Sequence, residues 1–485
     1  MLEESMRKKR PHPNLRRGLT TAAFLWPLSL AAVVFGQQTP PGTSQPYPLP
    51  STTPISRAAP AAAAAAAESP VHISFAQAEE SARKIEPAWL AQQTARGSAV
   101  YDRRMALAGL LPQATYHGEA LYTQPNGVPD SGPLPGTIGP VFIANNSVRE
   151  YISQAWVTDK LSLTGVARYR QASALSKQAQ AQAEIAARGL HVVVTLDYYA
   201  ALAAQHKLAA AQSAEQEAQR FDDLTRKLEA GREVAHADVL KAQLQWEQRQ
   251  RDLADAKQTL LATKESLGVL LFPDPSTPYD LDDTLNAQPN LPPEAQARAL
   301  AGASNPELRS ALATLQASRE DVRAAWGEYF PTLTLAYNYG IDAPYFAASG
   351  PNGRQFLGYS VGAGLDIPLW NWFTTHDKIK QSQLREHQAQ AGLDYAQRQL
   401  IAALDQSYNE LRAAATIFTS LQASVGQAQE SLRLTTLRYQ AGEASVLEVV
   451  DAQNTLFAAE SAVADGAARY HVARANLEQW TGPLP

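Results

Sequence analysis

The segment Lys227-Leu-Glu-Ala-Gly231 is followed by Asp238-Val-Leu-Lys-Ala-Gln243, and this pair of segments occurs twice in the chain. The second copy reads Arg438-Tyr-Gln-Ala-Gly442 and Glu448-Val-Val-Asp-Ala-Gln453, about 210 positions later. A displacement of this size is typical of domain duplication and not of the short periods of solenoid repeats. We therefore expect two copies of one structural unit.

Proline positions upstream of these segments support the duplication. Glu86-Pro87 precedes Leu111-Pro112 with 25 residues from proline to proline, and Asn305-Pro306 precedes Phe330-Pro331 with the same spacing. We assign the first repeat to residues 71–285 and the second to residues 286–482.

Long stretches without proline show what each unit contains. Positions 141–272 and 369–482 hold none, although the chain has 31 prolines. Because a proline inside a helix costs about 3 kcal/mol, these alanine-, glutamine- and leucine-rich stretches are predicted to form long helices.

The first 70 residues differ in composition from the rest. Residues 1–36 carry six basic side chains and then an apolar run from Thr21 to Phe35, which is the layout of a secretory signal peptide. The alternative is an anchoring helix, but the run is short and Pro27 interrupts it. Residues 37–70 are rich in proline, threonine, serine and alanine and are predicted to be a flexible linker.

Composition excludes several classes of protein. The 485 residues contain no cysteine, which excludes disulfides, thiolate metal sites and a lipid anchor on cysteine. A net charge of −5 does not indicate nucleic acid as a partner. After residue 70 no apolar run approaches the roughly 20 residues of a spanning helix, so any membrane crossing must use strands.

Four segments have the alternating pattern of strands. The clearest is 356–369, whose apolar residues all point one way: Leu357, Tyr359, Val361, Ala363, Leu365, Ile367 and Leu369. We predict its partner at 332–341 and the first-repeat strands at 113–124 and 148–163, with a Pro/Gly loop running to about Asn146. Tyrosine-rich apolar faces of this length suit the lipid-facing surface of an outer-membrane barrel. Four strands cannot close a barrel, so several chains must share one.

After each strand pair, apolar residues recur at the spacing of a helix. In the second half these residues are Leu393, Leu400, Leu404, Leu411, Phe418, Leu421 and Val425. We predict that each long helix reverses at an Ala-Gly pair, Ala230-Gly231 or Ala441-Gly442, where the glycine adopts the left-handed conformation. Each half is then a hairpin whose turn lies far from the strands. The tyrosines Tyr198, Tyr199 and Tyr408 are expected to be packed in the core.

In order and spacing, these prolines, strand pairs and Ala-Gly turns resemble the TolC-like outer-membrane efflux protein family over residues 71–482. The resemblance implies a mainly α fold with a transmembrane β-barrel portion. Three identical chains would form a trimeric α-barrel and share a 12-stranded β-barrel. It also implies a cell outer-membrane location, contact with outer-membrane lipid, and a large periplasmic part that meets a periplasmic adaptor and an inner-membrane transporter.

The resemblance places functional residues around the two turns. Glu448 and Asp451 match acidic residues that narrow the periplasmic entrance, and Tyr439 and Asp238 match residues that tether the closed state. Ala230, Gly231, Ala441 and Gly442 match turns that dock to an adaptor. Acids repeated threefold around a narrow pore would attract cations and impede anions. The alternative for Glu448 and Asp451 is a solvated helix face.

The second turn departs from the family pattern in one respect. A basic residue often found two positions beyond the glycine is replaced by Ala444, and Arg232 is a candidate to compensate for it. The first turn also carries one more residue than the second before its Ala-Gln.

The chain has no pattern that indicates catalysis. His376 and His387 are 11 residues apart with no matching carboxylates, so a zinc site is not expected. Gly362-Ala-Gly364 lies within a predicted strand, which argues against dinucleotide binding. His117 and Glu119 share a polar strand face and are expected to face a wet lumen. We expect no enzyme activity, cofactor or metal.

The function predicted is a passive outer-membrane channel of a tripartite efflux system that carries small toxic compounds or drugs. One alternative is the outer-membrane component of type I protein secretion. An alternative of another class is a soluble periplasmic coiled-coil adaptor or structural protein, which would have one hairpin between small β-rich domains.

Overall fold

The structure, a computed structural model, describes residues 71–122, 149–286 and 288–484. These residues belong to one compact unit, Ser69–Pro485. The predicted signal peptide 1–36, the linker 37–70 and the loop up to Asn146 lie outside the described residues.

Most of the described chain is helical. Its elements, in order, are β1 (Val71–Ile73), α1 (Phe75–Ile85), α2 (Pro87–Ala108), β2 (Gln113–Tyr122), β3 (Arg149–Leu161), α3 (Leu163–Ala230), α4 (His236–Leu271), β4 (Tyr279–Leu281), α5 (Glu294–Ser304), α6 (Pro306–Gly327), β5 (Thr332–Ala343), the 3-10 turn η1 (Pro351–Gly353), β6 (Leu357–Asp366), α7 (Thr374–Gln440) and α8 (Val446–Thr481).

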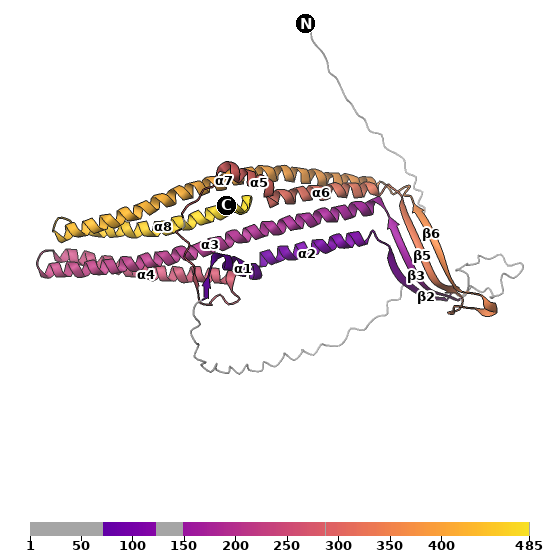
Figure 1. The fold of residues 1–485 in the computed structure, drawn as a ribbon, viewed down its shortest axis with the longest axis horizontal. Coiled ribbons are helices and arrows are strands. Elements are labelled where there is room, and N and C mark those ends of the chain that lie inside the picture. Colours follow the sequence, from indigo (N-terminus) through magenta and orange to yellow (C-terminus); the bar gives the residue numbers. More distant parts are fainter. Residues whose placement is uncertain (1–70, 123–148, 287, 485) are drawn as a thin grey trace, which may run out of the picture. The chain divides into compact units, whose positions relative to one another are not determined.

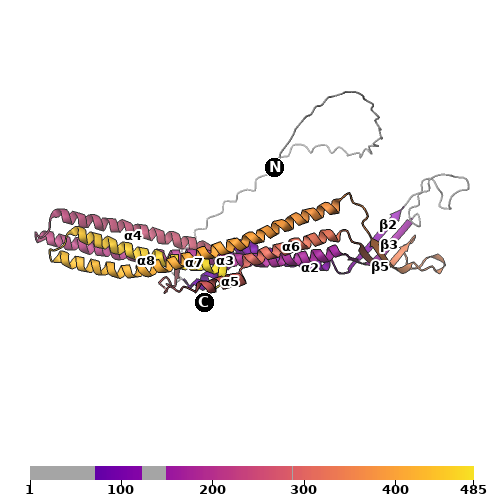
Figure 2. The same ribbon diagram turned by 90° about the horizontal axis from the view of Figure 1, so that it is seen from above.

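The element order repeats. Helices of 68 and 36 residues, α3 and α4, form the first hairpin, and helices of 67 and 36 residues, α7 and α8, form the second. Figures 1 and 2 show these helices running alongside one another, with the strands at one end of the unit and both hairpin turns at the other. The predicted fold class, mainly α with a duplicated unit of two strands and a long helical hairpin, is confirmed.

Proline starts two of the shorter helices, and the apolar seam of α7 packs as predicted. Pro87 and Pro306 start α2 and α6, and the preceding Glu86 and Asn305 cap them by accepting hydrogen bonds from backbone N–H groups. Along α7 the predicted apolar seam faces inward, because five of its members are buried: Leu393, Leu400, Leu404, Leu411 and Phe418.

The main core lies at mid-length, where α3, α7 and α8 meet. Its largest fully buried side chains include Tyr198, Tyr470 and Phe418. The Tyr198 hydroxyl donates to the carbonyl oxygens of Ile73 (3.2 Å) and Asp282 (3.0 Å), which ties the C-terminal ends of both strands of a small sheet to α3. That sheet, the parallel pair β1 and β4, was not predicted because each strand has only three residues.

The four longer strands form one antiparallel sheet in the order β2-β3-β5-β6. Pairing places Tyr116, Ala155, Tyr339 and Tyr359 in one row on one face, and Thr115, Trp156, Asn338 and Ser360 in the adjacent row on the other. On the second face the Asn338 amide donates to Gln154 (2.8 Å) and its oxygen accepts from Ser360. The sheet therefore has one mostly apolar face and one mostly polar face.

The strand ends differ from the prediction. The strand expected at 356–369 ends at Asp366, which pairs with Thr332, the first residue after Pro331. Pro368 has no N–H to extend the ladder. The strand expected at 148–163 spans 149–161 because Ser162 caps α3. The strand expected at 332–341 extends to residue 343. The strand expected at 113–124 is present from 113 to 122, and residue 122 is the last described residue before a gap.

Both hairpin turns are Schellman motifs. The N–H of Glu233 donates to the Leu228 carbonyl (2.9 Å), and that of Glu443 donates to the Arg438 carbonyl (2.8 Å). In the second turn Gly442 is left-handed, as predicted, with φ of 77°. In the first turn the prediction was wrong: Gly231 has φ of −76°, and Arg232 occupies the left-handed position with φ of 62°.

This difference aligns the two repeats. Arg232 takes the place of Gly442, and Gly231 takes that of Ala441, so α4 and α8 both start five residues after the preceding cap. The apparent extra residue in the first turn arises only when the two Ala-Gly pairs are matched to each other. In this register Asp238 and Glu448 occupy equivalent positions in the first turns of α4 and α8.

We predict that Gly442→Ala and Gly231→Ala have opposite effects on local stability. Forcing alanine into the left-handed region costs about 1–2 kcal/mol, whereas alanine at a right-handed position stabilises by about 0.5 kcal/mol. Hydrogen exchange by mass spectrometry, on peptides covering each turn, should show faster exchange around residue 442 and unchanged or slower exchange around residue 231. Similar changes in exchange rate at both turns would contradict the finding that Gly442 is left-handed and Gly231 is not.

Candidate functional site at the hairpin tips

The two turns lie close together in the structure because a small apolar core joins them. This tip core contains Phe221, Ala242, Tyr439, Val446 and Val449, one or more from each long helix. The rings of Phe221 and Tyr439 meet edge to face with centroids 5.1 Å apart. The tip core therefore holds the first hairpin against the second.

Two of the predicted tether residues, Tyr439 and Asp238, meet at this core. Tyr439 is 5% exposed, and burial raises the pKa of its hydroxyl more than the nearby Thr225 side chain lowers it, with a smaller rise from the Asp238 carboxylate. The hydroxyl has no hydrogen-bond partner among the described residues. Asp238 is half-buried and accepts from Lys241 one helical turn away (3.4 Å). The structure thus brings the two side chains together without a direct hydrogen bond.

The predicted acid Glu448 is held in a fixed place by the start of α8. Its Oε1 accepts from the Ser445 backbone N–H (3.0 Å) and hydroxyl (3.1 Å), while Ser445 caps the Glu448 N–H in return. These hydrogen bonds, with the guanidinium of Arg438 adding to them, hold the pKa of Glu448 below its ordinary value. Glu448 is therefore ionised at neutral pH.

The second predicted acid, Asp451, lies one helical turn after Glu448 and is exposed. Residues three apart lie on the same side of a helix, so both acids face the same direction near the turn. The predicted turn residues Ala230, Gly231, Ala441 and Gly442 are all at the tip, and all four are exposed.

A basic residue that no sequence pattern singles out, Arg438, lies at the second turn. Arg438 donates to the Glu443 carbonyl (3.2 Å) and lies 3.5 Å from the Glu448 carboxylate. Arg232 was considered as a replacement for a basic residue at Ala444, but it belongs to the other turn and is exposed. The basic partner of Glu448 within one chain is therefore Arg438.

A second residue that no sequence pattern singles out, Arg249, links α4 to α8 farther from the turns than the tip core. Arg249 is 7% exposed and donates to Asp252 (2.8 Å) and to Asn454, and its guanidinium lies 4.5 Å from the Phe457 ring centroid. Gln245 also donates to Asn454 (2.8 Å). The contact joins residues about 205 positions apart, so no local pattern could indicate it.

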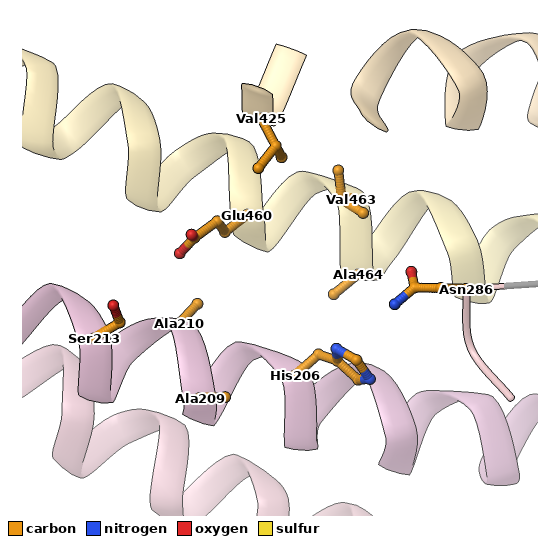
Figure 3. A pocket seen from close by; sticks show the side chains of 9 residues that line it. All are labelled: His206, Ala209, Ala210, Ser213, Asn286, Val425, Glu460, Val463 and Ala464. Atoms are coloured by element: carbon orange, nitrogen blue, oxygen red, sulfur yellow. The ribbon is translucent and has the colours of Figure 1, made fainter. Parts of the chain in front are cut away.

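A pocket of about 330 Å³ lies between the hairpins farther from the tip. Figure 3 shows His206, Ala210 and Ser213 of α3 on one side, and Glu460 and Ala464 of α8 on the other. Burial raises the pKa of Glu460. The seam between the hairpins is therefore less tightly packed here than at the tip core.

At mid-length, His191 lies between two carboxylates. Its Nδ1 is 3.4 Å from Glu79 and its Nε2 is 3.3 Å from Glu478, so α3 is joined to α1 and α8. Both ring nitrogens can donate only in the protonated ring. The hydrogen bonds to Glu478 and then Glu79 raise the pKa of His191 to about 9.

Other groups give little indication of chemistry. Within the described ranges, no three histidine, cysteine or acidic side chains are grouped so that they could bind a metal ion. None of the described helices is long and apolar enough to cross a membrane. As expected, Tyr198, Tyr199 and Tyr408 are buried in the main core.

Comparison with known proteins identifies a group with this architecture. Residues 298–483 match the family described as outer membrane efflux protein. The chain is 26% identical to outer membrane protein TolC of Salmonella enteritidis over 185 residues, which is 37% of this chain and 38% of TolC. It is 30% identical to the pyoverdine export outer membrane protein OpmQ of Pseudomonas aeruginosa over 161 residues, 32% of each chain. The aligned segments thus span about a third of these relatives.

Similarity in structure extends further than similarity in sequence. The Campylobacter jejuni CmeC outer membrane channel superimposes with a TM-score of 0.69 at 14% identity, covering 84% of this chain and 85% of CmeC. At that identity the likeness establishes the fold alone.

We predict that the stability contributed by His191 is lost as pH rises. The folded-state pKa of about 9 lies above the ordinary 6.5, so the contribution is fully present below pH 6.5 and disappears through about pH 9. After solvent screening is allowed for, it is on the order of 1–2 kcal/mol. The thermal midpoint of wild type should fall between pH 6.5 and 9.5 more than that of His191→Gln. The control is His387→Gln, on an exposed part of α7, whose thermal midpoint should vary with pH as that of wild type does. If the thermal midpoints of wild type and His191→Gln fell by the same amount over this pH range, His191 would not contribute this stability.

Proposed function

We propose that this chain, which belongs to the TolC-like outer-membrane efflux protein family, is the outer-membrane channel of a tripartite efflux system. Its location is the cell outer membrane, with a large periplasmic part. Energy would come from an inner-membrane transporter, reached through a periplasmic adaptor, and the cargo would be small toxic compounds or drugs.

The observation that carries this proposal is the four-stranded sheet at the end of the unit opposite the hairpin turns. Its two outer strands, β2 and β6, each have a partner on one side only, so their outer edges are unpaired among the described residues, and every residue of β6 is exposed. Unpaired backbone groups are tolerated in water but not in hydrocarbon. Pairing β6 of one copy with β2 of the next would satisfy them, and three copies would make a closed barrel of twelve strands.

The two faces of the sheet support the same arrangement. The face carrying Tyr116, Tyr339 and Tyr359 would meet lipid, and the face carrying His117, Asn338 and Ser360 would line a wet channel. On the polar face His117 lies 3.2 Å from Glu119, and both side chains are about half exposed. An exposed pair of this kind fits a water-filled lumen better than a catalytic site.

At the other end, Glu448 and Asp451 would form the charged entrance. A trimer repeats both acids three times around the axis, and Glu448 is held ionised by Ser445. Tyr439 and Asp238 would keep the hairpins together in the closed state, and the exposed turn residues Ala230, Gly231, Ala441 and Gly442 would meet the adaptor. The alternative of a coiled-coil adaptor is not supported, because an adaptor would have one hairpin and this chain has two.

We predict that the full-length protein is recovered in the outer-membrane fraction and needs detergent for extraction. Cross-linking before solubilisation should give a species of three chains. Recovery in the soluble periplasmic fraction without detergent would rule out the channel and restore the adaptor alternative.

We predict that neutralising the entrance acids weakens cation binding. The variant Glu448→Gln/Asp451→Asn keeps a side chain at position 448 that can complete the capping box, so the helix start should remain intact. In planar bilayers the concentration of a trivalent cation needed for half-block should rise about tenfold or more, because fewer negative charges face the ion.

The matched control for this test is Glu430→Gln. Glu430 is an exposed acid of α7, and its one ion pair within the described part of the chain is with Arg433 in the same helix, at 2.7 Å. It should leave the block unchanged. If the Glu448→Gln/Asp451→Asn channel were also half-blocked at the wild-type cation concentration, Glu448 and Asp451 would be ordinary solvated residues and not part of the entrance.

A further inference from the structure

The pocket of about 330 Å³ between the two hairpins, which we call the seam pocket, has the size of a small-molecule site. Helices of both hairpins line it. Figure 3 shows the Glu460 carboxylate directed from α8 toward the side of α3 that carries Ser213. Most of the remaining wall consists of small apolar side chains: Ala209, Ala210, Val425, Val463 and Ala464.

A much smaller cavity, of about 20 Å³, shares Ser213 and Glu460 with the seam pocket. We call it the head cavity. Its other walls include Glu217 of α3, together with Gln453 and the ring of Phe457 from α8. A cavity of this size holds one group no larger than a water molecule. The two cavities together have room for an apolar body and one small polar group.

The polar groups around the head cavity are acceptors that lack donors. Gln453 is 8% exposed, and its amide N–H donates to the Glu217 carbonyl oxygen (3.4 Å), while its side-chain oxygen is buried with no partner in the described part of the chain. No charged group among the described residues offsets the burial of Glu460, which raises its pKa more than the Gln429 side chain lowers it. A cation that donates hydrogen bonds would satisfy both groups.

Basic side chains near the two cavities already have partners. His206, in the wall of the seam pocket, lies 2.9 Å from Asp283. Lys207, the next residue of α3, pairs with Asp465 at 2.5 Å. These two side chains therefore do not supply the positive charge that Glu460 lacks.

We propose that the two cavities bind an amphiphilic ammonium compound, with a compact apolar body in the seam pocket and a primary ammonium group in the head cavity. The ammonium donates to the Glu460 carboxylate, the Ser213 hydroxyl and the side-chain oxygen of Gln453. The site goes beyond the proposed function and does not depend on it. Because Ser213 belongs to the first hairpin and Glu460 to the second, the bound compound stabilises the contact between the hairpins.

The test is isothermal titration calorimetry of the purified full chain in detergent. The probe is cyclohexylmethylammonium, an apolar ring that carries one primary ammonium group, and its neutral analogue is cyclohexylmethanol. Wild type should bind the amine at one site per chain and about tenfold or more tightly than the alcohol, because hydrogen bonds between charged groups are stronger than those of a neutral hydroxyl.

Two variants locate the site. Glu460→Gln should weaken binding of the amine about tenfold or more and leave binding of the alcohol nearly unchanged, because only the amine uses the charge. Ser213→Met places a larger side chain where the two cavities meet and should weaken binding of both compounds. The matched control is Glu430→Gln, which removes an exposed acid of α7 outside both cavities and should bind the amine as wild type does. It also corrects for amine taken up by the detergent.

Hydrogen exchange by mass spectrometry tests whether the compound contacts both hairpins. The bound amine should slow exchange in the peptides around Ser213 of α3 and around Glu460 of α8. Slower exchange in one hairpin alone would overturn the site.

Two calorimetric results would also overturn it. One is equal affinity of wild type and Glu460→Gln for the amine. The other is equal affinity of wild type for the amine and the alcohol, a comparison that does not depend on the folding of any variant. Neither result bears on the channel function, because these measurements involve no transport and no membrane. Conversely, recovery of the chain in the soluble fraction would leave the binding site in place.

Discussion

The polar groups of the peptide backbone constrain this protein more than any other feature. The four strands pair with one another, yet β2 and β6 present their outer N–H and C=O groups beside an apolar face. Such edges need partners wherever water is excluded. In the proposed trimer, further copies of the same sheet supply those partners, so assembly and membrane insertion would be a single requirement. The long helices α3 and α7 would follow the same symmetry, because each continues from a strand of the sheet after a short connection.

At the opposite end, the same chain is held by a smaller set of buried contacts. The tip core is small, and the Tyr439 hydroxyl within it lacks a partner in the described part of the chain. Above it, Arg249 makes the buried polar link between α4 and α8. A buried cation is costly to leave without its partners, so this link depends on a few specific side chains, unlike the broad aromatic core around Tyr198. The physical contrast is between a broad apolar core at mid-length and a small core at the tip with buried polar groups close to it.

The first turn shows how local sequence can mislead about geometry. Two Ala-Gly pairs looked equivalent, yet Gly231 is right-handed and Arg232 occupies the strained position. The packing of the helices on either side of the turn sets which residue is left-handed. The free energy gained by burying the apolar seams of these helices far exceeds the cost of one left-handed residue. The same lesson applies to residues 367–369: they alternate as a strand would, but Pro368 and the end of the partner strand stop the ladder.

Sequence alone determined the duplication, the two long hairpins, the four strands and their apolar face. Each of these follows from the spacing of apolar residues along a segment or from the positions of the prolines. It also indicated the tip residues Tyr439, Asp238, Glu448 and Asp451 through a family resemblance. Only the tertiary structure decided that Arg438 accompanies Glu448, that Arg249 links α4 to α8, and that His191 joins Glu79 and Glu478. Most of these contacts join residues that are far apart in the chain, and no local pattern encodes how two distant helices come to lie side by side.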